Sequence, residues 1–533
     1  MKKWIFLALF LAVSVLLQAQ DVLSDPARRA PVSGTKPQPS HFHQLEAESI
    51  QQVFEGTYNA AGMGLFQPAS GSLTSLSGQY GKGDFRRAQE GDSFRGFTFS
   101  TLRYDRFNEW LFMRGSFHYS FDRETNRKWS DVRDPWLSNP FIYGSSVAKD
   151  YTSHQGGLSF DLYTAPLLGW ISAGLRMKYE VDDISGLRDP RPRTQCLRLH
   201  VVPSVLFSIG AHQVGLDFGY GFDKEKLNNL TTIQSYPNLY YYRMSGVGFV
   251  EGTIGGYGAF KRQFEGHRGL GDLSWGYASG ALRMLVSGGA EYFTQNVLGD
   301  KKQSPGAYNE WTYRGRAEMQ ITSGKYLHRV LLNGQARDGG ADEYLQELQS
   351  THDERGVSSE NWVTLYTYRN RYMVKTGRVE GSYSLYGGFN GKDYLWRVSG
   401  SAGWSMFSRE HFLPYSNFGA VQWHGSLSGL VRVLELNGHR LELSLDVATT
   451  LRGKVWQELY QDNLYVQEVL LPDRDYYSRH HLDLSGDITW TFPLNLGKAG
   501  LANGFVRFGG EWIRAFPKAQ WYQLALSVGL FTF

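Results

Sequence analysis

Apolar and polar residues alternate, one for one, through segment after segment of this chain. From Leu441 to Leu451, leucine, valine and threonine occupy every second position, and the positions between them include glutamate, serine and aspartate. The same two-residue period runs through Leu482–Phe492 and Leu111–Asp122. Side chains of a β-strand point alternately to its two faces, so each segment has one apolar face and one polar face.

The length of these segments distinguishes them from the strands of water-soluble proteins. They run to roughly a dozen residues, about twice the usual length of a soluble strand. A strand tilted by about 45° needs roughly 9–11 residues to cross the hydrocarbon layer of a membrane. The 61 glycines and the 15% of aromatic residues also suit a barrel wall. We therefore predict an all-β fold: a transmembrane, antiparallel, up-and-down β-barrel of about 18 strands, within a range of roughly 14–20.

The connections between the predicted strands are of two kinds. Tight turns are predicted at Gly210-Ala211 and at Asn437-Gly438. Membrane barrels have short periplasmic turns and longer external loops, so we place the long connections outside the cell. These long connections are Arg123–Ser153, Asp223–Met244, Asp338–Asn361 and Gly453–Arg479. About nineteen or twenty strands can be drawn in all, with Trp362–Tyr372 and Arg378–Phe389 as separate strands.

The amino terminus has the layout of a secretory signal. Residues 1–3 carry charge, Trp4–Leu17 is almost wholly apolar, and Ala19 offers a cleavage point. We predict a cleaved signal peptide over residues 1–19, an N-terminal extension over residues 20–71 and the barrel over residues 72–533. Within the extension, Gln44–Glu55 is compatible with a helix that lies in the periplasm or plugs the lumen.

Charge, cysteine content and motifs exclude several classes of function. The formal net charge of +4 is too small to indicate nucleic-acid binding. Cys196 is the only cysteine, so no intramolecular disulfide is expected. The sequence has no nucleophile elbow, no His-Glu-x-x-His zinc motif and no phosphate-binding loop. We expect neither enzymatic activity nor a cofactor.

One arrangement of residues has catalytic potential. His480 and His481 follow a long connection that contains Asp473 and Asp475. A His–Asp pair at the barrel rim would activate water for hydrolysis. The same residues are equally ordinary polar residues at a membrane interface.

If the apolar faces of the strands meet lipid, their polar faces meet the lumen. The candidate lumen-lining residues are Arg114, His118, Asp122, Arg176, Lys178, Glu180, Asp217, Arg397, Glu442, Asp446, Arg452, Asp483 and Asp487. Their charges are of both signs. They either line a water-filled channel or pair, with one another or with a plug, and close it.

Tyrosines cluster in the long connections. The candidate recognition residues are Tyr236, Tyr240, Tyr241, Tyr242, Tyr460, Tyr465, Tyr476 and Tyr477. Loop tyrosines pack as a lid, contact a ligand or partner, or anchor the chain at the membrane interface.

The last segment, Trp521–Phe533, is an amphipathic strand that ends on phenylalanine. This ending resembles the sorting signal that the barrel-assembly machinery reads in outer-membrane proteins, so we expect that machinery and outer-membrane lipid as partners. Phe531 and Phe533 fall on the small-residue face of the strand. A bulge near Leu530 would move them to the other face.

The whole mature chain resembles the outer-membrane β-barrel proteins of Gram-negative bacteria. More narrowly, it resembles a family of such barrels known only as a domain of unknown function, which implies an outer-membrane location and no functional residues. A second resemblance is local. Asn59–Leu65 is similar to the Asn-Pro-Ala-Gly-Leu segment of the long-chain fatty-acid transporter family, which there precedes a plugging hatch, although Ala60 replaces the proline here.

These features favour a barrel that gives solutes passive passage across the outer membrane, with loops that select what enters. An alternative is a non-conducting scaffold that docks a surface lipoprotein or another barrel. A further alternative is a transporter of hydrophobic compounds, which requires a lateral gap in the wall.

Overall fold

The computed structural model describes residues 41–65, 70–136, 138–228, 230, 240–254, 261–299, 303–352, 358–496 and 501–532. All of them belong to one unit, residues 39–533. The predicted signal peptide and residues 20–40 of the predicted extension lie outside this part of the chain. None of the described helices is long and apolar enough to cross a membrane.

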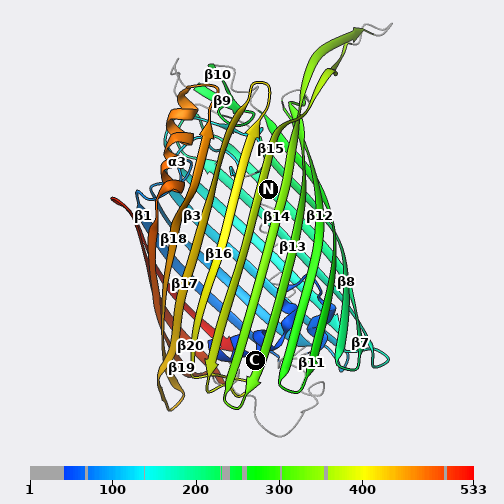
Figure 1. Ribbon diagram of the computed structural model, residues 1–533, viewed down its shortest axis with the longest axis vertical. Coiled ribbons are helices and arrows are strands. Elements are labelled where there is room, and N and C mark those ends of the chain that lie inside the picture. The colour runs from blue at the N-terminus through cyan, green and yellow to red at the C-terminus, as the bar shows by residue number, and fades with distance from the viewer. Residues whose placement is uncertain are drawn as a thin grey trace. The chain divides into compact units, whose positions relative to one another are not determined.

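Within the described residues, 18 long strands form one closed antiparallel sheet (Figure 1). Each strand pairs with the next barrel strand along the chain, and β21 pairs back onto β1 to close the ring. The strands β4, β9 and β10 are left out of the ring and form a small separate sheet. The predicted up-and-down barrel and its strand number of about 18 are confirmed.

The barrel strands are β1 (Gly71–Gly83), β2 (Ser93–Arg106), β3 (Leu111–Arg127), β5 (Lys149–Thr164), β6 (Ile171–Gly186), β7 (Arg193–Ile209), β8 (His212–Leu227), β11 (Arg262–Ser279), β12 (Leu282–Leu298), β13 (Gly306–Ser323), β14 (Tyr326–His352), β15 (Ser358–Gly387), β16 (Trp396–His411), β17 (Ser416–Leu436), β18 (His439–Glu458), β19 (His481–Asn495), β20 (Leu501–Ala515) and β21 (Ala519–Thr532). The small sheet contains β4 (Tyr143–Gly144), β9 (Tyr240–Met244) and β10 (Val250–Ile254). The helical elements are α2 (Phe42–Gln51), the 3-10 turns η2 (Val53–Gly56) and η3 (Ala61–Leu65), the π-helical turn η6 (Val466–Leu470) and α3 (Leu471–Ser478).

The two-residue period decides which side chains face outward. Leu427 on β17 is 63% exposed and Leu445 on β18 is 55% exposed, whereas Glu442 is only 3% exposed. Residues paired in register share a face of the sheet, and Leu427 lies opposite Val447. The apolar face therefore forms the outer surface of the barrel, and the polar face lines its interior.

The predicted division between two strands was wrong. Trp362–Tyr372 and all but the last two residues of Arg378–Phe389 belong to the single strand β15, which ends at Gly387. The turn expected at residues 373–377 is continuous strand that pairs with residues 336–340 of β14. A bulge lies just before it, at residues 369–371, and Asn370 within the bulge has a φ of 47°. The bulge shifts the two-residue period without ending the strand, so β15 continues through both predicted segments.

The predicted long connection Asp338–Asn361 was also wrong. Most of it is strand, because β14 runs to His352 and β15 begins at Ser358. The neighbouring strands end earlier, so β14 and β15 continue past them as a ribbon that pairs only with itself (Figure 1). Both faces of such a ribbon lie outside the membrane, so no apolar alternation marks it in the sequence.

The connections give the barrel two different ends. The tight-turn end has hairpins such as the one at Asn437-Gly438, whose φ angles of 52° and 80° suit a two-residue turn. The opposite, long-loop end carries β4, β9, β10, η6 and α3.

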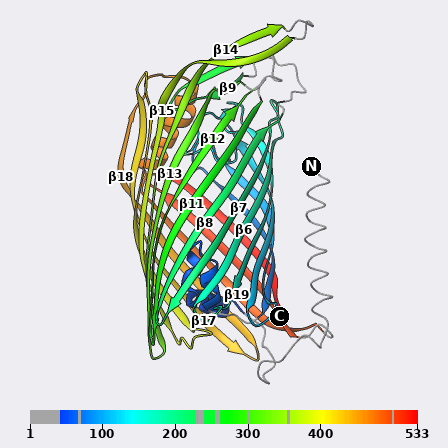
Figure 2. The same ribbon diagram turned by 90° about the vertical axis from the view of Figure 1, so that its right-hand side faces the viewer.

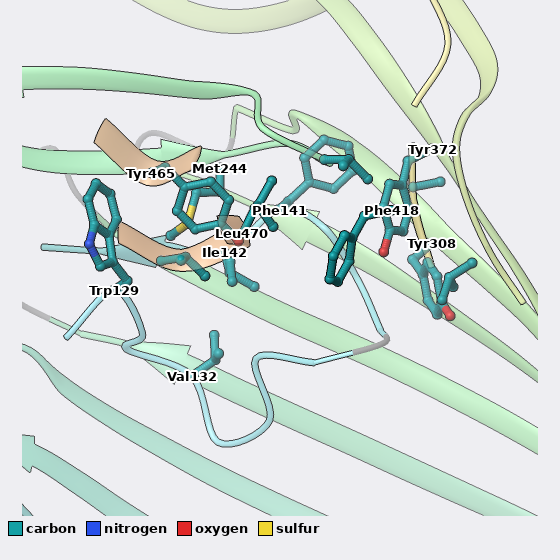
Figure 3. Close-up of a cluster of buried hydrophobic side chains, with 14 of the residues drawn as sticks. Trp129, Val132, Phe141, Ile142, Met244, Tyr308, Tyr372, Phe418, Tyr465 and Leu470 are labelled. Atoms are coloured by element: carbon teal, nitrogen blue, oxygen red, sulfur yellow. The ribbon is translucent and has the colours of Figure 1, made fainter. Parts of the chain in front are cut away.

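At the long-loop end, residues 128–136, 138–148, 240–254 and 459–480 pack together, and we call them the loop cover. Trp129, Met244 and Leu470 of the loop cover lie in one buried apolar cluster with Tyr372 and Phe418 of the barrel wall (Figure 3). The long loops therefore pack against the inner wall.

The last strand keeps its register throughout the described residues. Leu530 and Phe531 pair with β1 without a shift, so the predicted bulge near Leu530 is absent there. Phe531 is buried on the inner face, where its ring lies 4.9 Å from Phe42 and 5.4 Å from Phe505. These apolar partners explain why the inward position suits phenylalanine. Phe533 lies outside the described residues.

The opposed faces of the wall give a first testable prediction. Leu427→Arg puts a charge on the outer face near the middle of β17, and we expect the free energy of unfolding to fall by roughly 2–4 kcal/mol. Ser428→Arg is the matched control, because its side chain starts on the inner face, and we expect a loss below about 1 kcal/mol. Urea unfolding of the barrel in lipid vesicles, followed by tryptophan fluorescence, measures both. Equal losses would contradict the orientation of β17.

Candidate functional site

The candidate site is built around a short helical segment inside the barrel. Residues 41–65, which we call the lumen segment, lie within the barrel at its tight-turn end (Figure 2). His41 caps α2, because its Nδ1 accepts a hydrogen bond from the Gln44 N–H at 3.3 Å. Ala47 and Ile50 form the buried face of α2 and pack in an apolar cluster with Leu327 of β14.

Glu46 holds α2 to one wall of the barrel. Its carboxylate pairs with the Arg397 guanidinium of β16. It also accepts hydrogen bonds from the hydroxyls of Tyr394, at 2.5 Å, and Tyr386, at 3.4 Å. The Glu46 and Arg397 side chains are 31% and 25% exposed, so water screens the ion pair only in part.

Glu55 holds the lumen segment to the other wall. Its carboxylate lies 2.5 Å from Arg114 Nη1 of β3, and Arg176 of β6 donates to the Thr57 carbonyl at 2.5 Å. In the ring of 18 strands, β3 and β16 lie nearly opposite each other. The lumen segment therefore bridges the interior between two arginines on opposite walls.

A third set of contacts surrounds the start of α2. His41 Nε2 lies 3.6 Å from Asp393 Oδ2, and His43 Nε2 lies 3.3 Å from Glu442 Oε1. Arg432 and Arg440 lie 2.6 and 3.2 Å from the Asp393 carboxylate. Asp393, in the connection between β15 and β16, thus joins the two histidines to two arginines of the wall.

Burial sets the charge of these histidines. It lowers the pKa of His41 from 6.5 to about 3, and the positive charge of Arg440 adds to the shift. Burial also lowers the pKa of His43, with Arg432 acting in the same direction. Burial raises the pKa of Asp393, but contacts with His41 and Arg432 outweigh it and hold that pKa below its usual value. At neutral pH, the histidines are neutral and Asp393 is ionised.

The end of the lumen segment is fixed by a turn at Asn59. The Asn59 Nδ2 donates to the Val205 carbonyl at 3.1 Å, and its Oδ1 accepts from the Gly62 N–H at 2.8 Å. The Ala61 N–H donates to Ser204 Oγ at 3.0 Å. Asn59–Leu65, the stretch with the local resemblance to fatty-acid transporters, is therefore a turn bound to β7.

Two cavities flank the lumen segment. One, of about 380 Å³, lies between residues 56–58 and the inner faces of β8 and β11–β15, and Asp217 and Arg314 are among its lining residues. The other, of about 300 Å³, lies between α2 and the opposite wall, where Arg114 and Asp487 line it. The lumen segment thus separates two polar spaces.

The predicted lumen residues fall into several groups. Arg114, Arg176, Arg397 and Glu442 contact the lumen segment, and Asp217 and Asp487 line the cavities. Elsewhere, Lys178 pairs with Glu180 at 2.7 Å, Asp122 accepts from the Gln79 amide at 3.1 Å, His118 lies against Gly157, and Asp446 and Asp483 share the inner face of β18 and β19. The side chain of Arg452 lies outside the description.

The loop tyrosines differ in burial. Tyr241 and Tyr465 are buried in the loop cover, at 0% and 4% exposure, and Tyr460 is 62% exposed. The remainder of the predicted set is placed as follows: Tyr240 and Tyr242 lie on β9, Tyr476 stacks on Phe85, Tyr477 packs on Phe407, and Tyr236 lies outside the described residues. Tyr241 donates to Asp131, which also accepts from Tyr151. Tyr241 and Tyr465 therefore hold the loop cover together from within.

The residues predicted as a rim His–Asp arrangement have other neighbours. Asp473 is buried and accepts a hydrogen bond from the Ala88 N–H at 2.8 Å. His480 stacks on Phe516, and His481 lies against Phe85. These contacts tie the loop after β18 to the connections β1–β2 and β20–β21.

Sequence reasoning missed the residues that fix the lumen segment. Glu46 and Glu55 lie in the segment predicted as a helix that plugs the lumen, so their charges were an available signal. Asp272 was also missed, although the exposed residues Leu273 and Trp275 show by alternation that it faces inward. No feature of the sequence pointed to Asp393, because it lies in a connection outside any periodic pattern.

Comparisons with known proteins give a family but no activity. No curated protein matches the chain. Among solved structures, it is similar to the copper transporter OprC (9% identity, 87% of this chain and 81% of that chain, TM-score 0.35). It is also similar to the CymD monoaromatic hydrocarbon channel (9% identity, 89% of this chain and 91% of that chain, TM-score 0.30). A third similar structure is the F3-3 variant of the FrpB iron transporter from Neisseria meningitidis (8% identity, 88% of this chain and 82% of that chain, TM-score 0.37).

These structural similarities are too distant to carry an argument about function. The comparisons do not show the predicted similarity to the fatty-acid transporter family. A family model, described as a family of unknown function (DUF6850), matches residues 60–532. The match spans the whole barrel and agrees with the predicted resemblance to a family without an assigned function. The chain therefore belongs to this family of unknown function, DUF6850.

Proposed function

We propose that this chain is an outer-membrane transport barrel in which the lumen segment is a plug that controls passive passage of polar solutes. The observation that carries this proposal is the bridge across the interior, from Arg397 and Glu46 on one wall to Glu55 and Arg114 on the other. A segment held by ion pairs at both ends closes a path without a covalent bond and leaves it reversibly.

The interior suits such a path once the plug moves. An 18-strand barrel is wide enough for an aqueous channel. Polar side chains on the inner face replace the water around a polar solute and so lower the cost of its transfer. The loop cover is the surface that a solute meets at the long-loop end. The passage needs no cofactor in this mechanism.

The proposed location follows from the same wall. The apolar outer face suits membrane lipid, and the signal-like residues 1–19 suit export. We infer that the barrel-assembly machinery reads β21, whose outer face carries Leu524 and Leu526 at 47% and 51% exposure.

The ion pairs of the plug give a direct test. In Glu46→Gln/Glu55→Gln, both carboxylates lose their charge while side-chain shape is kept. We expect docking of the plug to weaken by about 2 kcal/mol, which raises the open fraction of the barrel roughly 30-fold. Single-channel recording of the refolded barrel in a planar bilayer measures this fraction.

Glu48→Gln is the matched control for this test. Glu48 lies on the same helix and accepts a hydrogen bond at 3.0 Å from Gln44 of that helix. We expect Glu48→Gln to behave like the wild type. A folded double variant with the wild-type open fraction would contradict the role of the two ion pairs.

The rival function is a non-conducting scaffold for a surface lipoprotein or another barrel. One observation favours it: the ribbon of β14 and β15 extends past its neighbouring strands and exposes Leu345, Leu365 and Tyr366, at 51%, 57% and 57%. A scaffold also predicts exposed loop tyrosines, whereas Tyr241 and Tyr465 are buried. We therefore place passage first.

A further inference from the structure

The larger cavity beside the plug contains a negative charge without a counter-charge. Asp217 of β8 lies directly opposite Asp272 of β11 in the antiparallel pairing, and both side chains face inward. Carboxylates that face each other across two strands repel. Such a pair persists when a positive charge or a proton compensates it.

Asp217 is the uncompensated member of this pair. It is 1% exposed and lines the cavity, and among the described residues neither of its carboxylate oxygens has a hydrogen-bond partner. The side-chain amide of the neighbouring Asn59 donates to the Val205 carbonyl at 3.1 Å, and it stabilises the Asp217 carboxylate beside it only in part. A buried ionised carboxylate without hydrogen bonds is costly, so this position calls for a donor that the chain itself does not supply.

The other charges of the cavity are already paired. Arg314 donates to Asp272 at 3.3 Å and to Glu291 at 3.0 Å, and its guanidinium lies 4.6 Å from the centre of the Tyr58 ring. Arg316 pairs with Glu318 at 2.5 Å, and Arg378 pairs with Glu380 at 2.6 Å. The cavity therefore has three arginines engaged by carboxylates and one carboxylate, Asp217, that is not engaged.

We propose that Asp217 and Asp272 form a binding site for the ammonium group of a small primary amine, in the cavity between the plug and the wall. An ammonium group has three N–H donors and no acceptor. Two of them match the free oxygens of Asp217, and the third is directed to Asp272, which gives only one oxygen to Arg314. The cavity of about 380 Å³ accommodates a small solute and excludes a large one.

The position of the site connects binding to the plug. Gly56, Thr57 and Tyr58 of the lumen segment line the same cavity. An amine that contacts both the wall and the plug stabilises the docked plug by mass action. The site deepens the proposed function and rests on it, because it names the solute class that the lumen recognises.

Direct binding tests the site without a need for conduction. The full chain is refolded in detergent in the presence of radiolabelled methylammonium, so that the cavity is loaded before it closes, and binding is measured by equilibrium dialysis at pH 7.5. We expect one saturable site in the wild type. We expect Asp217→Asn to weaken binding about tenfold or more, because it removes a charge-assisted hydrogen-bond acceptor, and Asp272→Asn to weaken it less.

Asp487→Asn is the matched control. Asp487 lines the other cavity and is paired with Arg507 at 3.0 Å, so we expect unchanged methylammonium binding. Altered migration of the heated barrel on gels shows that each variant has folded. Wild-type protein that binds no methylammonium overturns the proposal, as does Asp217→Asn with unchanged affinity. An infrared band of a protonated carboxyl group that is lost in Asp217→Asn also overturns it, since Asp217 then carries a proton instead.

The outcomes separate this inference from the proposed function. Absence of methylammonium binding, with conductance that rises when the plug is weakened, removes the amine site and leaves the gated passage. Binding in a barrel that never conducts keeps the site and removes the passage.

Discussion

A barrel that lacks residues 42–65 is expected to carry steady ionic current where the full chain is nearly silent. The deletion removes the helix and turns that bridge the interior between Arg397 and Arg114. Without them, the 18-strand wall surrounds an open space, and we expect the mean current per inserted barrel to rise at least about tenfold. Recordings in planar bilayers at high salt, with equal amounts of folded protein, make the comparison.

The wall itself is expected to tolerate this deletion. The strand pairing from β1 to β21 does not pass through the lumen segment, and the main apolar loss is the buried face around Ile50 and Phe54. Migration on gels and circular dichroism check that the deleted protein folds. Deletion and Glu46→Gln/Glu55→Gln act on the same plug, so the double substitution gives intermittent openings and the deletion gives permanent ones.

A second barrier at the long-loop end needs its own control. Asp131 of the loop cover accepts hydrogen bonds from the hydroxyls of Tyr241 in the same cover and Tyr151 of β5, and Asp131→Ala removes that shared acceptor. If the deletion is silent alone and conducts with Asp131→Ala, the loop cover is a second gate. If the folded deletion is silent both alone and in this combination, the barrel is not a passage, and the scaffold function takes its place.

The sequence was sufficient for the wall because one rule governs the whole wall. A residue such as Leu445 meets lipid and its neighbour Asp446 meets the interior, and this opposition repeats along every strand that crosses the membrane. The rule stops working where the environment changes. Past the rim, water covers both faces of β14 and β15, so the ribbon of these strands was predicted to be a loop.

The site was harder to predict, because its contacts join residues that are distant in the chain. Glu46 and Arg397 are 351 positions apart, as are His43 and Tyr394. No local sequence pattern reveals such a pair. A charged side chain on the inner face of a barrel also has many equivalent candidate partners. The unpaired state of Asp217 is even harder to predict from the sequence, since it depends on where the Asn59 side-chain amide points.

Acid is expected to release the plug, with the largest change between about pH 6.5 and pH 4. His41 keeps a pKa of about 3 while the plug is docked, because burial and Arg440 disfavour its charged form. Once undocked and in water, it titrates near its usual 6.5. Between these values the undocked state binds a proton and the docked state does not, so a falling pH favours undocking. From pH 7.5 to pH 5, His41 alone shifts the equilibrium by about 2 kcal/mol, roughly 30-fold.

The charged and titratable groups around the two histidines set the pH range of this effect. They are Arg440, Asp393, Arg432, Glu46, Glu442 and Tyr394. His43 has a lowered pKa and adds to the effect in the same direction. Asp393 has a lowered pKa, so its stabilising charge is lost only as the pH falls below its ordinary value of 3.8. The histidines therefore act first, and the carboxylate acts below this window.

The loop cover is expected to respond to acid in the opposite sense. Burial raises the pKa of Asp473 in α3 to about 6, so below that pH the folded cover binds a proton that an exposed aspartate does not. Falling pH through this range therefore stabilises the packed cover. Opening at pH 5 is then assigned to the tight-turn end, where the histidines lie.

Two substitutions separate the histidines from every other acid effect. His41→Asn keeps a side-chain oxygen to cap α2, and His43→Gln keeps a polar side chain beside Tyr394, but neither titrates in this range. In the wild type, we expect the open fraction in bilayers to rise about 30-fold from pH 7.5 to pH 5. In His41→Asn/His43→Gln, we expect it to stay nearly flat, while His480→Gln at the opposite end keeps the wild-type response. An acid response of full size in the double variant would show that the proton acts elsewhere.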